Sequence, residues 1–325
     1  MSSYKLICEH KMDSRDCRNG YADALAQLLK ENEKVVHIDC DLMGCVGVSQ
    51  LAKEYPDRVI NAGIAEANAI GAAAGMAATG LIVFMHTFGV FAGRRISDQV
   101  FLSAGYSELP VHIIGTDPGV TAAINGATHM PFEDCASYLT IPNAIVLDPC
   151  DYAQAFALTK KCAQSDKLTY MRLIRRGFKT VYADGSDFQI GKGLTLKEGN
   201  DVTIICSGIM VNNALKAYEI LKEQRINARV IDMFTWRPLD EELIIKAAKE
   251  TGAIVTAENH QVTCGLGNAV ASVIVRNCPV PQEYIGIQNR YGQVGPQDDL
   301  EREYELTAED IVKACIKAIN RKKGN

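Results

Sequence analysis

Short apolar runs alternate with helix-like segments through the first 175 residues. The unbroken apolar runs predict strands at 35–38, 59–60, 81–85, 111–114, 144–147 and 168–174. Between them, apolar positions spaced three or four apart predict helices at 19–32, 48–55, 96–104, 132–139 and 152–164. A further helix of small residues begins near Ala65. Strands that are apolar on both faces and alternate with helices are typical of a parallel sheet covered on both sides.

The pattern changes between residues 177 and 200, which are polar and rich in glycine. This stretch predicts a linker, with a domain boundary near residue 190. A second alternation follows, with strands predicted at 202–206, 228–231 and 253–257, and helices at 212–224, 240–251, 268–276 and from 307 onward. We therefore expect an α/β protein of two consecutive three-layer domains with mainly parallel sheets, residues 1–185 and 190–325.

Composition narrows the class of protein. The net charge of −5 comes with no basic block, so we expect no nucleic-acid partner. No run approaches the roughly 18 apolar residues of a membrane span, and the first residues lack a signal-peptide pattern. The 11 cysteines are irregularly spaced without a CxxC pair, which indicates reduced thiols and no zinc site. We expect a soluble, cytoplasmic protein that holds no metal through its own side chains.

Polar residues follow the ends of the predicted strands, where ligands bind in open α/β sheets. Such residues include Asp39, Asp41, Glu66, His86, Asp117 and the segment 125–129. Glu66 is the only ionisable residue at the start of its small-residue helix. It either complements the helix dipole at the surface or is a buried carboxylate that needs a partner. Singly, His86 reads as a structural strand-end histidine, and Phe88 and Phe91 read as core residues.

Two further groups leave their roles open. Arg172, Arg175 and Arg176 cluster at the end of one strand, where they meet either an anionic substrate or solvent. In the second domain, Gly265 and Gly267 precede a helix but lack the full dinucleotide fingerprint. For these glycines, and for residues 258–260, an interface or structural role is the better interpretation.

Several motifs together resemble the transketolase family. The matching segments of the first domain are Pro56-Asp-Arg-Val-Ile-Asn-Ala-Gly-Ile-Ala-Glu-Ala-Asn68, Thr87-Phe-Gly-Val-Phe91, Asp98-Gln99, Asn125-Gly-Ala-Thr-His129, Glu133-Asp134 and Ile141-Pro-Asn143. Those of the second are Met233-Phe-Thr-Trp-Arg-Pro-Leu-Asp240 and Glu258-Asn-His260. The first set is similar to the pyrimidine-binding domain and the second to the C-terminal domain. The Gly-Asp-Gly…Asn motif that binds magnesium and diphosphate in full-length members has no counterpart, so the chain resembles the C-terminal subunit of a split transketolase.

The resemblance implies roles for individual residues. Thiamine diphosphate would be the cofactor, with its pyrimidine ring held by Glu66, Phe88, Phe91 and Arg94. Glu66 and His129 would be catalytic. Contacts to the sugar substrates would come from Cys45, Asp117, Asn125, His129 and Arg175. A separate N-terminal subunit would hold the diphosphate with Mg²⁺ or Ca²⁺, in an α2β2 assembly with a homodimeric core, where the bare helix face at Gly71 and Gly75 is the expected packing surface.

Three positions depart from the family pattern and leave the substrate open. Asp117 replaces a usual histidine, Asn125 an aspartate and Cys45 a serine. On the cofactor side, Arg94 stands where full-length members often carry an aromatic residue. We expect a two-carbon ketol transfer between anionic or otherwise altered sugars. The alternatives are a 1-deoxyxylulose-5-phosphate-synthase-like fragment, the decarboxylase β subunit of a 2-oxo-acid dehydrogenase, and a non-catalytic scaffold that kept the fold.

Overall fold

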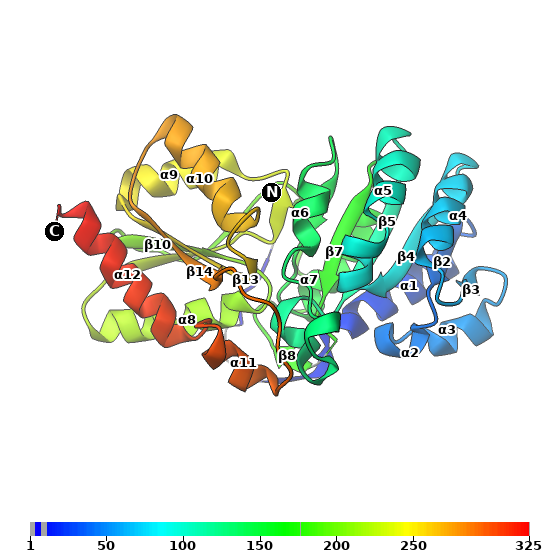
Figure 1. The fold of residues 1–325 in the computed structure, drawn as a ribbon, viewed down its shortest axis with the longest axis horizontal. Helices are drawn as coiled ribbons and strands as arrows, with labels where there is room; N and C mark the ends of the chain where they lie inside the picture. Colours follow the sequence, from blue (N-terminus) through cyan, green and yellow to red (C-terminus); the bar gives the residue numbers. More distant parts are fainter. Residues whose placement is uncertain (1–3, 8–11, 176, 325) are drawn as a thin grey trace.

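The computed structural model describes residues 4–7, 12–175 and 177–324. Two α/β units lie side by side, each with a mainly parallel sheet between helices (Figure 1). The first sheet has seven strands in the order β12-β6-β7-β5-β4-β2-β3, and the second has five in the order β14-β13-β10-β11-β9. The predicted fold class is confirmed. In the described ranges, no helix has both the length and the hydrophobicity to cross a membrane.

The strands of the seven-stranded sheet are β2 (Val35–Asp39), β3 (Val59–Asn61), β4 (Ile82–Phe88), β5 (Val111–Thr116), β6 (Ile145–Leu147), β7 (Thr169–Leu173) and β12 (Thr235–Arg237). Those of the five-stranded sheet are β9 (Leu194–Lys197), β10 (Val202–Cys206), β11 (Ala228–Asp232), β13 (Ile254–Gln261) and β14 (Gln282–Ile287). β1 (Met12–Asp16) and β8 (Gly177–Lys179) form a separate antiparallel pair. Only β9 and β12 run antiparallel to their neighbours in the two larger sheets as described.

The helices of the first half are α1 (Cys17–Glu31), α2 (Met43–Val46), α3 (Ser49–Glu54), α4 (Glu66–Ala78), α5 (Ser97–Gln99), α6 (Asp134–Leu139) and α7 (Tyr152–Cys162). The second half has α8 (Met210–Glu223), α9 (Glu241–Thr251), α10 (Leu266–Asn277), α11 (Gln297–Glu303) and α12 (Ala308–Lys322). Two π-helical turns, Phe91–Arg95 and Val100–Tyr106, flank α5.

Alternating side chains of the buried strands explain why the apolar runs are unbroken. Val35 and Phe84 belong to a core cluster with α1 and α7, whereas the adjacent Val36 and Val83 belong to a cluster with α4 and α6. Successive strand residues point to opposite faces, so both faces must be apolar when helices cover both. Each fully buried aliphatic or aromatic side chain contributes about 1.5–3 kcal/mol. In the second unit, α8 and α12 cover one face and α9 and α10 the other (Figure 1).

The structure departs from the predicted elements in specific places. β4 extends three residues beyond the predicted strand and ends at Phe88. The helix predicted at 96–104 consists of the short α5 followed by a π-helical turn. The elements that the pattern did not predict are β1, β8, β9, β12, β14, α2 and α11. Most of these are short, and their partners lie far away in the sequence, so no local periodicity marks them.

One strand of the second half completes the sheet of the first. β12 pairs antiparallel with β6, with Thr235 opposite Leu147 and Arg237 opposite Val146. Arg237 Nη1 also donates to the carbonyl of Leu139 at 2.7 Å. The boundary predicted near residue 190 falls between β8 and β9, yet the chain returns to the first sheet after it.

Candidate active site

Strand ends bring several of the predicted site residues to one edge of the seven-stranded sheet. Phe88 is the last residue of β4, Asp117 follows β5 and Arg175 lies two residues beyond β7. Glu66 is the first residue of α4, five positions after β3. Because these strands are parallel, their carboxyl ends share one edge, as the sequence predicted.

Glu66 is a buried carboxylate rather than a surface group at a helix start. Its side chain is 2% exposed. Arg95 Nη1 donates to Oε1 at 2.8 Å and to Oε2 at 2.7 Å. Thr87 Oγ1 also donates to Oε1, at 3.1 Å. A buried carboxylate requires such partners, so the second of the two interpretations of Glu66 is confirmed.

Three rings form an aromatic wall at the same edge. The ring centroids of Phe88 and Phe91 are 6.1 Å apart and tilted by 32°. His129 meets both edge-on, with its centroid 6.1 Å from Phe88 and 5.5 Å from Phe91. Its Nδ1 lies 2.9 Å from Thr128 Oγ1, so Nε2 is the ring nitrogen that this contact does not engage. The wall offers flat apolar faces beside one titratable ring nitrogen.

A cation is fixed next to Phe88. Arg175 Nε lies 3.1 Å from Asp117 Oδ1, and Arg175 Nη1 donates to Cys45 Sγ at 3.2 Å. The guanidinium carbon is 5.5 Å from the Phe88 ring centroid. Three of the residues predicted to contact substrate therefore lie together. Asn125 is half-buried at the end of the turn Gly119–Asn125, and Arg176 lies outside the described residues.

Sequence reasoning singled out Arg94 but missed its neighbour. Arg94 Nε pairs with Glu133 Oε1 at 2.8 Å, and both side chains are about half exposed. Arg95 instead bonds to Glu66, and its guanidinium carbon lies 3.8 Å from the Phe91 ring centroid. The available signal was the pair of adjacent arginines, three and four residues after Phe91.

Asp39 and His86 lie near the ends of β2 and β4, but they are buried in the protein and not open to a ligand. Both are fully buried, with His86 Nδ1 2.7 Å from Asp39 Oδ2 and Nε2 3.1 Å from Thr116 Oγ1. Burial favours the neutral form of Asp39, but hydrogen bonds from His37 and His86 outweigh it and hold the pKa of this carboxyl well below its usual range. The structural interpretation of His86 is confirmed.

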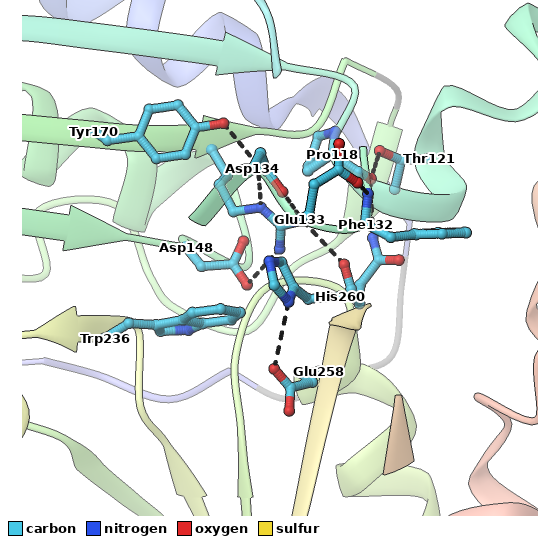
Figure 2. A network of polar contacts seen from close by, with 12 residues as sticks. Pro118, Thr121, Phe132, Glu133, Asp134, Asp148, Tyr170, Trp236, Glu258 and His260 are labelled. Carbon is cyan, nitrogen blue, oxygen red and sulfur yellow. Dashed lines mark hydrogen bonds and ion pairs between the residues drawn. The ribbon is translucent and has the colours of Figure 1, made fainter. Parts of the chain in front are cut away.

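Arg172 does not reach the site, so an interpretation of it as a substrate contact is wrong. Its side chain is fully buried where the two units meet. Nε donates to Asp134 Oδ2 at 2.9 Å and Nη2 to Oδ1 at 3.1 Å, while Asp148 lies 3.5 Å from Nη1. Figure 2 shows Tyr170 pointing at Asp134, to which its hydroxyl donates at 2.7 Å. Arg172 Nη2 also donates to the carbonyl of Asn259 at 2.9 Å, so the network joins β7 and α6 to the second unit.

Asn259 links the second unit to the loop that carries His129. Its Nδ2 donates to the carbonyl of Pro118 at 2.9 Å, and its Oδ1 accepts from Val120 N at 2.9 Å. Gly119 lies between them with φ of +54°, and a Cβ there would be 2.1 Å from Asn259 Oδ1. Only glycine fits this approach, so the start of the loop is held by the second unit.

The glycine turn before α10 is already occupied by a side chain. Glu258 accepts from Leu266 N at 2.7 Å and from Gly267 N at 2.9 Å. Burial raises the pKa of Glu258 to about 8. Figure 2 places Glu258 beneath His260, 4.0 Å away. These amides cannot also bind a nucleotide phosphate, which supports the structural interpretation of this turn.

One group of potential metal ligands occurs in the described ranges. Asp134, Cys135 and His260 each offer an atom within 4.8 Å of the others, and all three are buried. Both oxygens of Asp134 already accept hydrogen bonds from Arg172, and one also accepts from Tyr170. A cation there would compete with the buried guanidinium, so the donor set is not suited to a metal.

Comparisons with known proteins agree with the fold. Residues 13–179 match the family model for the transketolase pyrimidine binding domain, and residues 191–311 match the model for the transketolase C-terminal domain. The chain is 42% identical to the 6-deoxy-6-sulfo-D-fructose transketolase subunit SqwH of Clostridium sp. (strain MSTE9), over 97% of this chain and 98% of that protein. It is 36% identical to one of the subunits of the apulose-4-phosphate transketolase of Phocaeicola vulgatus, over 94% and 98%.

A solved structure is also similar throughout. It is described as a split gene transketolase in an inactive beta4 tetramer, and it superimposes with a TM-score of 0.87 at 40% identity, covering 95% of this chain and 100% of that one. Both family models, and the relatives that this chain matches over nearly their whole length, point to the same family. The chain therefore belongs to the transketolase family, of which it carries the pyrimidine-binding and C-terminal domains.

Proposed function

We propose that this chain is one subunit of a two-subunit transketolase that moves a two-carbon ketol unit from a ketose to an aldose. The observation that carries the proposal is the buried Glu66 carboxylate beside the aromatic wall of Phe88, Phe91 and His129. The aminopyrimidine of thiamine diphosphate is a flat ring with a basic nitrogen. It requires apolar faces and an acidic group within reach, and the residues present fit that requirement.

When bound, thiamine diphosphate supplies the electron sink for cleaving and forming the bond beside the ketose carbonyl. Glu66 would share a proton with the ring nitrogen, in a crevice where water competes little. Phe88 and Phe91 would fix the plane of the ring. His129, at the edge of both rings, would hold or move a proton at a substrate hydroxyl.

The diphosphate and its Mg²⁺ or Ca²⁺ would be held by a partner that carries the N-terminal transketolase half. The neighbour described as a split gene transketolase supports this division. Its beta4 tetramer is described as inactive, and we propose that this chain alone also self-associates without activity. Added Cβ atoms at Gly71 or Gly75 would meet nothing within 4 Å, so this face of α4 is open to a second copy in the proposed α2β2 assembly.

The substrate end that does not react would face Arg175. The two relatives are named for a sulfonated and a phosphorylated sugar, both anionic far from the ketol group. Asp117 pairs with Arg175 and offsets part of its charge. A sulfonate carries a single charge, whereas a phosphate monoester carries about −1.5 to −2, so the paired arginine is better suited to a sulfonate. Asn125 and Cys45 would complete the contacts to the sugar.

The test is reconstitution with the N-terminal subunit, thiamine diphosphate and Mg²⁺, followed by a panel of ketoses that end in a sulfonate, a phosphate or a hydroxyl. We expect turnover only with both subunits, and ketol transfer without loss of carbon dioxide, which separates this activity from the decarboxylating alternatives. Glu66→Gln should lower kcat at least about 100-fold, the usual contribution of a positioned acid–base group. Glu54→Gln, an exposed helical control, should not.

Two results would contradict the proposal. The first is full turnover by this chain without a partner. The second is a Glu66→Gln enzyme that stays within a few-fold of the wild type while it folds and assembles normally.

A further inference from the structure

Arg95 occupies the place where the proposed function requires a ring. Its guanidinium lies 3.8 Å above the Phe91 centroid, and its Nη1 donates to both oxygens of Glu66. A guanidinium is planar and cationic and presents N–H donors at its edge. A protonated aminopyrimidine has the same character, with a flat face for Phe91 and an N–H for the carboxylate. Arg95 and the ring therefore need the same two partners.

The contact also occupies both oxygens of Glu66. Oε1 accepts from Arg95 Nη1 and from Thr87 Oγ1, and Oε2 accepts from Arg95 Nη1. A ring nitrogen of the cofactor would need the position that Arg95 Nη1 holds. The geometry in the chain by itself is thus a resting arrangement. Proton exchange with the cofactor ring requires Arg95 to leave.

The Arg95 side chain is free to change its position, whereas the Glu66 side chain is held in place. The Arg95 side chain is 42% exposed, and it holds Glu66 through one terminal nitrogen rather than through a two-nitrogen fork. Glu66 is rooted in α4 at 2% exposure and keeps Thr87 as a partner if Arg95 departs. The neighbouring Arg94 is tied separately to Glu133, so Arg95 can swing out without breaking that pair.

Resting on the proposed function, we propose that Arg95 is a stand-in for the cofactor's aminopyrimidine: it covers Phe91 and occupies both oxygens of Glu66 until the ring displaces it. Arg95 is then a positioning residue that competes with the cofactor. In the empty chain it stabilises a buried carboxylate, and in the loaded enzyme it must lie elsewhere. The apparent Kd for the cofactor is then the intrinsic Kd divided by the fraction of chains in which Arg95 is not docked.

The experiment measures thiamine diphosphate affinity by calorimetry in the assembled two-subunit enzyme with Mg²⁺. Arg95→Met keeps the aliphatic stem but removes the planar cation. If Arg95 is docked in about nine chains of ten, Arg95→Met lowers the apparent Kd about ten-fold. The melting temperature of the isolated chain should fall by at least about 2 °C, because Glu66 loses its charged partner. Arg276→Met, which removes an exposed ion pair to Glu241, should change neither quantity.

A second background separates competition from a general effect on the site. In Glu66→Gln the carboxylate that both groups seek is gone, so adding Arg95→Met should no longer tighten cofactor binding. Should Arg95→Met fail to fold, Arg95→Lys keeps a cation without the planar stack. It should then shift Kd in the same direction by a smaller factor.

The outcomes distinguish this inference from the function on which it rests. An unchanged or higher Kd in Arg95→Met, with Glu66→Gln still inactive, overturns the stand-in role and leaves the transketolase proposal intact. A gain in affinity that persists in the Glu66→Gln background also overturns it. A wild-type complex that binds no thiamine diphosphate overturns both.

Discussion

Neutralising Asp134 should destabilise the protein more than any surface change of the same kind. Asp134 is fully buried and accepts from Arg172 at 2.9 and 3.1 Å and from Tyr170 at 2.7 Å. Asp134→Asn keeps the shape but leaves the buried guanidinium with Asp148 at 3.5 Å as its remaining anion. Breaking one side of a buried ion pair costs about 3–5 kcal/mol, against a total stability of about 5–15 kcal/mol.

Trp236 provides the assay. It is the only tryptophan of the chain and is 1% exposed, with its ring centroid 5.7 Å from the Arg172 guanidinium carbon. Its fluorescence during urea unfolding therefore reports on the junction of the two units. Asp134→Asn should lower the free energy of unfolding by about 3–5 kcal/mol. The urea midpoint should fall by that loss divided by the slope m of the unfolding curve.

Controls decide whether the cost comes from the buried charge. Glu241→Gln removes an exposed partner of Arg276 and should cost no more than about 1 kcal/mol. Combining Asp134→Leu with Arg172→Met removes both charges, and this double variant should be more stable than either single one. A loss below about 1 kcal/mol in Asp134→Asn, or a double variant as unstable as the sum of the two singles, would refute the reasoning.

Two further predictions concern buried groups near the same junction. Burial raises the pKa of Asp232 to about 7, so the folded state binds a proton that the unfolded state releases near pH 4, and stability falls as pH rises from about 4 to 7 by up to roughly 1.4 kcal/mol per unit. Asp232→Asn should flatten that slope in urea titrations between pH 5 and 7, and an unchanged slope would rule the carboxyl out as its source. Asn259→Ala leaves Pro118 O and Val120 N without their partner at a cost of about 1–3 kcal/mol, and faster amide exchange at Val120 together with a higher KM for the sugar would show that the loop has loosened. Exchange as slow as in the wild type would mean that the loop is held by other contacts.

The spacing of apolar residues was sufficient to predict the layered architecture, because both faces of each sheet are covered by helices. The same spacing could not identify Arg95 as a partner of Glu66. That residue belongs to a π-helical turn, Phe91–Arg95, whose wider winding changes which of two adjacent arginines faces Glu66. Resemblance to a family pattern pointed to Arg94 for the same reason, since a motif records positions and not the local winding.

Position relative to the strand end could have separated Arg172 from Arg175. Arg172 stands inside β7 between two buried residues, in a sheet that is covered on both faces, whereas Arg175 lies beyond the end of the strand. The anions that hold Arg172 come from distant segments, at Asp134 and Asp148, and no local pattern could name them.

The return of β12 to the first sheet bears on how the chain can be divided. A fragment that stops at residue 185 would leave the backbone donors and acceptors on one side of β6 without their neighbour. Bare sheet edges recruit other strands. The pyrimidine-binding domain has a family model of its own, yet as a separate fragment it would be prone to aggregation. Its solubility would depend on the sequence downstream of it.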